Sequence, residues 1–165
     1  MKQPPYFFDA PQEVHPERLW VLKHIGDPAG RVILDIGCGA HKTLPEAIGV
    51  DVRPVTDTLA SMDDIPLISF SADVIISRHS LEHALDTVQV LSEWRRLLKP
   101  GGMVLIILPD HAAINTLDVF YSAGQHLHAF TRESFQHLIN ALNIGLRLES
   151  IETVVEDWSF GAVLR

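Results

Sequence analysis

Short apolar runs alternate along this chain with longer amphipathic stretches. Five runs rich in Val, Ile and Leu have the length and boundaries of buried parallel strands. They lie at residues 31–36, 47–52, 57–61, 73–77 and 102–108. Two last runs, at 146–155 and 159–164, are joined by a tight connection at Glu156-Asp157, so they predict an antiparallel hairpin.

Three segments have the apolar spacing of amphipathic helices. The first begins at Pro16, a favoured first helical position, and carries Leu19, Trp20, Leu22 and Ile25. The second lies between the fourth and fifth strands and carries Val88, Leu91, Trp94 and Leu98. The third is capped by Thr131 and carries Phe135, Leu138, Ile139 and Leu142.

Strands that alternate with helices predict a doubly wound, Rossmann-like α/β fold with a mostly parallel sheet. The closing hairpin adds an antiparallel strand at one edge. In such sheets a ligand binds beyond the carboxyl ends of the strands, near the point where strand order reverses. The 165 residues favour one domain overall, with an arm and short helix at 1–30 and the sheet domain at 31–165.

The first crossover is too short for an ordinary helix. Only eight residues separate Gly39 from Ile48, whereas parallel strands usually need about a dozen. At about 1.5 Å per helical residue, eight residues cannot run back along a ~17 Å strand. We therefore expect a mostly extended crossover with at most one helical turn. Such a crossover leaves part of one sheet face uncovered. Either the N-terminal helix or another subunit, as in a homodimer, would then cover that face.

Composition and charge narrow the class of protein. Hydrophobic residues make up 47% and charged residues 21%, as in a globular domain. A net charge of −8 disfavours nucleic-acid partners. A single cysteine excludes an internal disulfide and favours a cytoplasmic location. No apolar run reaches the ~18 residues of a membrane span, and the polar, Pro-rich start is unlike a secretory signal.

A glycine turn follows the first strand in the segment Asp35-Ile36-Gly37-Cys38-Gly39. Glycine lets the backbone turn tightly and lets a ligand approach closely. Asp51 ends the second strand, where an acid is placed for ribose hydroxyls. A dinucleotide needs a third small residue at the position of Lys42, whereas S-adenosylmethionine (SAM), which has no pyrophosphate, does not.

Several motifs then occur in an order that resembles a known family. VILDIGCG, GVD, DVIISRHSLEH and RRLLKPGGMVLIILPD are similar to class I SAM-dependent methyltransferases of the small methyltransferase-domain (type 11-like) kind. The similarity covers the chain from Arg31 to its C-terminus. It implies a seven-stranded sheet with an antiparallel last strand, SAM as cofactor, and methyl transfer to a small-molecule or sugar or lipid-precursor acceptor.

The resemblance also implies which residues bind the cofactor. Asp35 is expected beneath the methionine end, and Asp51 on the ribose. Ser61 stands where the family usually has an Asp beside the adenine, and nearby Asp63 is an alternative. The full expected set is Asp35, Gly37, Cys38, Gly39, Asp51, Val52, Ser61, Met62, Asp63, Ser77, Arg78 and His79.

Histidines are the candidate catalytic bases. The sulfonium of SAM already activates the methyl group, so a base helps only when the acceptor carries a proton to lose. We rank His79 first because it lies nearest the expected cofactor, and His126 and His128 form a second candidate pair. Packing and backbone binding are the alternatives, above all for His83. No Cys or carboxylate pattern reinforces these histidines, so we expect no metal.

Two other functions stay open at this point. A SAM-binding module without catalysis, or a partner subunit, would also explain the short crossover and Ser61. An NAD(P)-dependent oxidoreductase is opposed by Lys42. The aromatic cluster Tyr6-Phe7-Phe8 is either a lid over the acceptor or a segment docked on the body.

Overall fold

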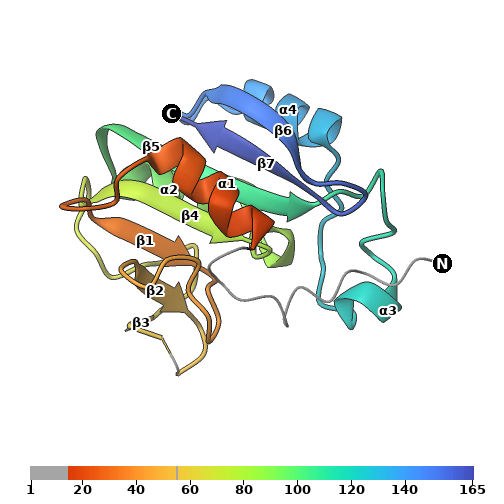
Figure 1. Cartoon of the computed structure of the whole chain (residues 1–165), viewed down its shortest axis with the longest axis horizontal. Helices are drawn as coiled ribbons and strands as arrows, with labels where there is room; N and C mark the ends of the chain where they lie inside the picture. Colours follow the sequence, from red (N-terminus) through yellow and green to blue (C-terminus); the bar gives the residue numbers. More distant parts are fainter. Residues whose placement is uncertain (1–14, 55) are drawn as a thin grey trace.

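A computed structural model describes residues 15–54 and 56–165, in which a seven-stranded sheet lies between helices (Figure 1). The strands follow the order β3-β2-β1-β4-β5-β7-β6. Their bounds are β1 Ile33–Ile36, β2 Ile48–Asp51, β3 Thr58–Leu59, β4 Ala72–Arg78, β5 Leu98–Pro109, β6 Leu148–Val155 and β7 Ser159–Leu164. The first five pair in parallel, while β7 is antiparallel to both β5 and β6. The predicted doubly wound fold is confirmed, and strand order reverses between β1 and β4.

The helices begin where the capping residues indicate. In the described residues they are α1 Pro16–Ile25, the 3-10 turn η3 Leu81–His83, α2 Thr87–Leu97, α3 Val119–Ser122 and α4 Arg132–Ala141. The predicted cap of α4 is confirmed, because the Thr131 hydroxyl accepts from the Ser134 backbone N–H at 3.1 Å. The Ser134 hydroxyl in turn accepts from the Thr131 N–H at 2.9 Å, which completes a capping box.

Helix α1 covers the sheet face that the short first crossover leaves open (Figure 1). Residues 37–47 contain no helix, as their number predicts. Trp20, Val21 and Ile25 are buried with Leu44 of the crossover. Leu19 is 48% exposed, so its predicted place in the core is wrong. The buried positions of α1 are instead Glu17, Trp20, Val21 and Ile25, which share one face of the helix.

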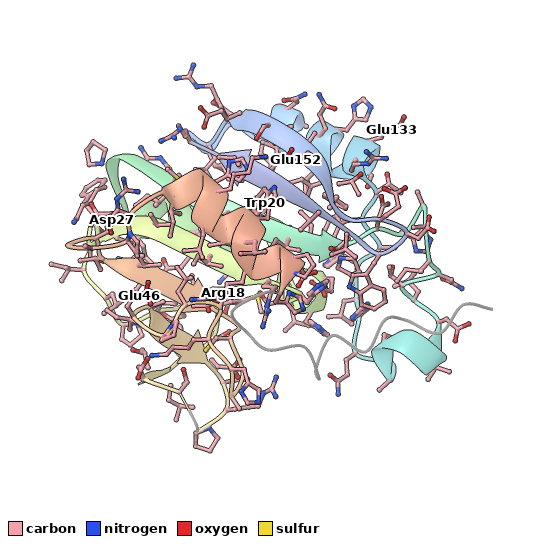
Figure 2. All side chains as sticks on the ribbon, viewed as in Figure 1. Arg18, Trp20, Asp27, Glu46, Glu133 and Glu152 are labelled. Carbon is pink, nitrogen blue, oxygen red and sulfur yellow. The ribbon has the colours of Figure 1, made fainter. Side chains whose placement is uncertain are left out.

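A buried tryptophan and one glutamate hold α1 against the β6–β7 hairpin (Figure 2). The Trp20 Nε1–H donates to Oε1 of Glu152 at 2.8 Å. Lys23 Nζ donates to the same oxygen at 3.0 Å, and His24 Nε2 lies 3.0 Å from it. These hydrogen bonds lower the pKa of Glu152 to about 2. A Cβ on Gly161 of β7 would lie 2.6 Å from the indole, so glycine is what lets Trp20 sit on the strand.

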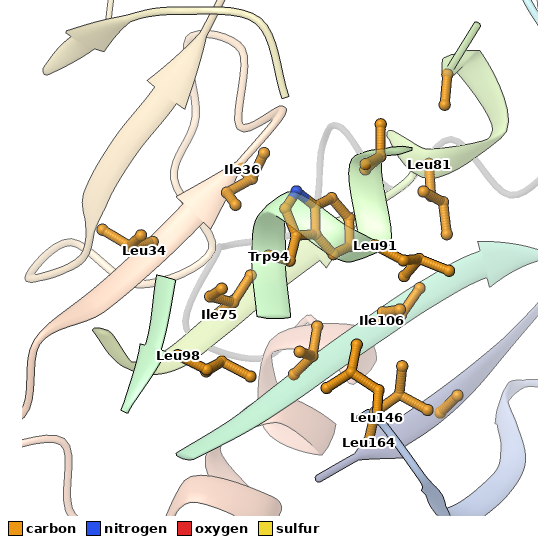
Figure 3. Packing of buried hydrophobic residues seen from close by; sticks show 14 of the residues in the cluster. Leu34, Ile36, Ile75, Leu81, Leu91, Trp94, Leu98, Ile106, Leu146 and Leu164 are labelled. Atoms are coloured by element: carbon orange, nitrogen blue, oxygen red, sulfur yellow. The ribbon is translucent and has the colours of Figure 1, made fainter. Parts of the chain in front are cut away.

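Helices α2 and α4 cover the opposite face of the sheet. Leu91 and Trp94 of α2 pack on Ile75 and Ile106 in the larger core cluster (Figure 3). The predicted stripe on α2 is partly wrong, because Val88 is 41% exposed. The other buried apolar side chains of the helix are those of Val90 and Leu97. Leu98 is buried too, but it already belongs to β5.

Candidate functional site

The glycine turn lies at the carboxyl end of β1, next to the point where strand order reverses. Gly37 and Gly39 have φ values of 74° and 58°, which favour glycine. A Cβ on Gly37 would lie 2.2 Å from Cβ of Ser80. The Ser80 hydroxyl donates to the carbonyl of Ile36 at 3.0 Å and is 2.7 Å from the Ser77 hydroxyl. The close approach of Ser80, which lies between β4 and η3, therefore requires glycine here. Local sequence pattern gave no indication of this role of Ser80.

Asp51 occupies the place predicted for it, beside the glycine turn. Its buried carboxylate accepts from the Gly39 N–H at 2.7 Å and from the Arg53 N–H at 2.9 Å. An ionised carboxylate offers about four acceptor positions, so about two remain for a pair of hydroxyl donors. Backbone N–H groups of the turn and of Arg53 therefore position the Asp51 side chain. Val52, the next residue, is 68% exposed.

A second acid, Asp35, is buried beneath the turn. One carboxylate oxygen accepts from the Thr43 N–H, and the other has no partner among the described residues. Burial raises the pKa of Asp35 to about 6, although the Thr43 hydrogen bond opposes this shift. At neutral pH the group is mostly ionised. Its negative charge fits a cationic ligand above the turn.

Polar side chains around the turn have definite partners. The exposed guanidinium of Arg53 lies 3.4 Å from Asp51 and reaches over Gly39, so a ligand there has to displace it. The exposed guanidinium can turn into water, while the buried Asp51 carboxylate keeps its two backbone N–H partners. Burial raises the pKa of the Cys38 thiol, which stays neutral at pH 7. Lys42 binds Asp57 at 2.9 Å.

The segment predicted to contact an adenine follows β3. The Ser61 hydroxyl donates to the carboxylate of Asp63, and the Met62 carbonyl accepts from the Trp94 indole at 3.0 Å. The Ala60 N–H donates to the carbonyl of Asp51 at 3.0 Å. The segment is thus tied to the carboxyl end of β2, while its contact with a nucleobase stays a prediction.

His79 directly follows β4, has a left-handed φ of 50°, and is held by a buried acid. Its Nε2 lies 2.7 Å from Oε1 of Glu17, which also accepts from the Ser159 hydroxyl at 2.9 Å. Burial alone would raise the pKa of Glu17, but His79 and its neighbours lower it to about 2. Burial by itself would lower the pKa of His79. The carboxylate of Glu17 outweighs this effect, so the pKa of His79 is raised. The sequence gives no signal for Glu17, because only tertiary packing brings α1 to this histidine.

Two further histidines face a buried glutamate on η3. Nδ1 of His83 is 3.0 Å from the Gln125 carbonyl, so the backbone-binding role considered for His83 is confirmed. Nδ1 of His126 is 2.8 Å from the Thr116 carbonyl. Both Nε2 atoms approach Oε1 of Glu82, at 3.9 and 3.7 Å. Glu82 was not among the predicted site residues, although it belongs to the DVIISRHSLEH segment that carries the family resemblance.

His128 has other partners than His126. Its Nε2 lies 2.9 Å from the Ala84 carbonyl, and its ring packs near Phe130. The side chain lines a surface cavity of about 420 Å³ with Leu85, Val88 and Leu138. The structure therefore places His79 and His126 near Glu82 and His128 on a separate cavity.

Two features complete the description of the site region. Among the described residues no helix combines the length and apolarity that crossing a bilayer requires. The aromatic cluster Tyr6-Phe7-Phe8 lies outside the described residues, so its role as lid or docked segment stays a prediction.

A family model described as a methyltransferase domain matches residues 13–150. The chain belongs to this methyltransferase family. The resemblance seen in the sequence motifs is thereby confirmed, and the oxidoreductase alternative is set aside. The match includes α1, which packs into the sheet core of this methyltransferase chain.

Known relatives agree with this assignment. A probable S-adenosylmethionine-dependent methyltransferase of Mycolicibacterium smegmatis is 28% identical over 78% of this chain and 54% of its own length. The chain thus spans about half the length of that relative. A SAM-dependent methyltransferase from Aquifex aeolicus has a similar fold, with a TM-score of 0.71, 18% identity and coverage of 95% and 94% of the two chains.

A second solved structure shares the fold and was determined with ligands. It is the 1,6-didemethyltoxoflavin-N1-methyltransferase of Burkholderia thailandensis, with bound 1,6-didemethyltoxoflavin and S-adenosylhomocysteine. Its TM-score is 0.73 at 15% identity, and the match covers 96% of this chain and 80% of the other. The seven-stranded methyltransferase fold is therefore shared by proteins of very different sequence.

The buried charge of Asp35 leads to a stability prediction. Its folded pKa of about 6 lies above the usual value, so ionisation destabilises the fold. The cost is absent where Asp is protonated in both states, below its usual pKa, grows as pH rises to about 6, and is constant above. Asp35→Asn should therefore raise the free energy of unfolding at pH 7.5 by about 1–3 kcal/mol, at roughly 1.4 kcal/mol per pKa unit.

Urea denaturation at pH 7.5 and pH 4.5 measures this effect. The gain should shrink at the lower pH, because wild-type Asp35 is then largely protonated in the fold. A variant that is less stable than wild type at pH 7.5 would show that the Asp35 charge has a partner in the fold.

Proposed function

We propose that this chain transfers the methyl group of SAM to a small acceptor at the carboxyl edge of β1, β2 and β4. The observation that carries the proposal is the position of Asp51. Its carboxylate accepts a hydrogen bond from the Gly39 N–H and keeps acceptor positions free for the hydroxyls of a ligand. Family membership supports the same reaction class.

The chain's own residues fit each part of this cofactor. Asp51 accepts from the ribose hydroxyls. A ligand reaches the turn at Gly39 once the Arg53 guanidinium has moved aside, whereas Ser80 occupies the space beside Gly37. One buried oxygen of Asp35, which has no hydrogen-bond partner within residues 15–54 and 56–165, adds negative charge beneath the cationic end. Ser61–Asp63 is the proposed adenine side. SAM, when bound, supplies a methyl group activated by its sulfonium.

On the acceptor side we assign His79 as the proton-accepting residue. Ionised Glu17 accepts the Nε2–H of His79, which fixes the ring. Nδ1 on the other edge of the ring then holds the lone pair and lies 3.9 Å from Oε1 of Glu82, too far for a hydrogen bond. About a quarter of the His79 side chain is exposed, at 27%, so an acceptor can reach it. His126 and His128 are the secondary candidates. The indole of Trp158, 6.1 Å from the His79 ring, helps to enclose this position.

The nature of the acceptor and the setting of the enzyme are part of the proposal. The charge of −8 disfavours nucleic acids, so a small molecule or a sugar or lipid precursor is the proposed substrate. A small acceptor is supported by the Burkholderia enzyme of the same fold, which was solved with bound 1,6-didemethyltoxoflavin. We keep a cytoplasmic location and a homodimer as proposals.

Cofactor binding and transfer are measured separately. Calorimetry should show one SAM or S-adenosylhomocysteine per chain and a raised melting temperature, with no response to NAD, since a ligand of the folded state stabilises it. Transfer of a labelled methyl group is then followed over a panel of hydroxyl, amine and thiol acceptors. Absence of any SAM binding would contradict the proposal, whereas binding without transfer across the panel would favour the inactive module.

The base assignment is tested with two histidines in turn. His79→Ala should lower kcat by about 10²–10⁴-fold while the Kd for SAM is kept. His128→Ala should have a much smaller effect, because its Nε2 is engaged by the Ala84 carbonyl. If neither substitution lowers kcat while cofactor affinity holds, the base is another group.

A further inference from the structure

Glu82, His83 and His126 form a compact side-chain cluster beside the glycine turn, here called the Glu82 cluster. One potential ligand atom from each residue lies within 4.8 Å of the other two. The Nε2 atoms of His83 and His126 lie 3.9 and 3.7 Å from the same carboxylate oxygen. A single ion placed between these atoms could contact all three side chains.

Backbone carbonyls fix the orientation and tautomer of both rings. Nδ1 of His83 faces the Gln125 carbonyl, and Nδ1 of His126 faces the Thr116 carbonyl. Because a carbonyl only accepts, each Nδ1 carries the hydrogen, and in the neutral ring Nε2 then holds the lone pair. Metal-binding histidines are oriented in the same way, by a hydrogen bond from the second ring nitrogen.

Glu82 is the second, independent observation. The side chain is 1% exposed, and neither carboxylate oxygen has a hydrogen-bond partner among the described residues. Burial raises the pKa of this carboxyl. A buried carboxylate without a donor is costly. Here the Nε2 lone pairs of His83 and His126 face it as well. Nδ1 of His79 also lies 3.9 Å from Oε1 of Glu82, beyond hydrogen-bond distance, so a cation held between Glu82, His83 and His126 would still offset that cost.

We propose that Glu82, His83 and His126 bind a divalent first-row transition metal ion, of which Zn²⁺ is the probe. Two imidazoles and one carboxylate suit such ions, whereas Mg²⁺ and Ca²⁺ prefer oxygen ligands. Metal–ligand bonds of about 2.0–2.2 Å bring two ligand atoms to roughly 3–3.5 Å, so modest side-chain rotation closes the site. This proposal departs from the expectation of no metal, because the fold joins histidines that are far apart in the sequence.

The position of the Glu82 cluster would allow a bound ion to contact the methyl acceptor. Three protein ligands leave at least one coordination position open, and the 32% exposure of His83 gives access to it. Ser80, which precedes the cluster, contacts the glycine turn. The open position would take an oxygen atom of the acceptor, a step that rests on the proposed function. Metal binding itself is measured without cofactor or acceptor, so the two proposals fail separately.

The test uses the full chain after EDTA treatment and dialysis, titrated with ZnCl₂ or MgCl₂ in a calorimeter. We expect one Zn²⁺ per chain, with much weaker Mg²⁺ binding. His126→Ala and Glu82→Gln should each weaken Zn²⁺ binding at least about tenfold. The matched control is His137→Ala, an exposed histidine of α4 outside the cluster, which should leave the Kd unchanged.

Three results would overturn the proposal: no Zn²⁺ uptake by the wild type, Zn²⁺ affinity unchanged in His126→Ala, or Mg²⁺ bound as tightly as Zn²⁺. Circular dichroism verifies that each variant is folded. If Glu82→Gln does not fold, His83→Ala replaces it, because that ring is partly exposed and less important for packing.

Discussion

Asp51→Asn is expected to weaken SAM binding by about ten- to a hundredfold. A hydrogen bond to a charged group contributes about 1.5–3 kcal/mol, and each 1.4 kcal/mol is tenfold in affinity. The asparagine keeps the size of the side chain, but its amide group cannot accept from Gly39, Arg53 and two ribose hydroxyls together. The Kd for SAM, from calorimetry, is the measurement.

The matched control for Asp51 is Glu46→Gln. Glu46 is exposed on the first crossover and also carries one negative charge (Figure 2), so its loss changes net charge equally. SAM affinity should stay within about twofold of wild type, since exposed charges are well screened. Equal losses in both variants would mean that Asp51 acts only through overall charge, and an unchanged Kd in Asp51→Asn would remove Asp51 from the cofactor site.

Gly37→Ala is expected to destabilise the fold by about 2–5 kcal/mol. The left-handed φ of 74° costs a non-glycine residue about 1–2 kcal/mol. The new Cβ would also lie 2.2 Å from Cβ of Ser80, and overpacking of this kind costs about 1–3 kcal/mol. Chemical denaturation measures the sum.

Gly30→Ala separates the two causes. Gly30 has the same φ of 74°, but no atom lies within 4 Å of its added Cβ, so only the conformational cost of about 1–2 kcal/mol applies. Ser80→Gly in the Gly37→Ala background should restore part of the loss by removing the clash. Equal destabilisation at Gly30 and Gly37 would show that Ser80 moves aside freely.

Most of the sheet follows from local pattern. Buried parallel strands are continuous apolar runs, so their positions could be predicted within a few residues, as for 73–77 against Ala72–Arg78. The short first crossover followed from counting residues against strand length. Errors arose where burial depends on a neighbour, as for Leu19 and Val88, because helical spacing alone does not say which side of an apolar stripe meets the sheet.

Some residues of the candidate site could likewise be predicted from the sequence, and others could not. Asp35, Gly37, Gly39 and Asp51 could be predicted because each lies at the end of a strand or in the turn that follows it, and the carboxyl ends of parallel strands meet at one edge. The ligand contacts of all these residues, and of Val52 and the Ser61–Asp63 segment, stay predictions. Their role depends on side-chain directions that no short pattern encodes.

The parallel core, the glycine turn with its acids and the methyltransferase family could all be predicted from the amino-acid order, because they depend on spacing along the chain. Tertiary packing was needed to show that α1 covers the open sheet face, that Glu17 holds His79, and that His126 joins Glu82 and His83. These contacts join residues far apart in sequence, so they form only after the sheet and its loops have assembled.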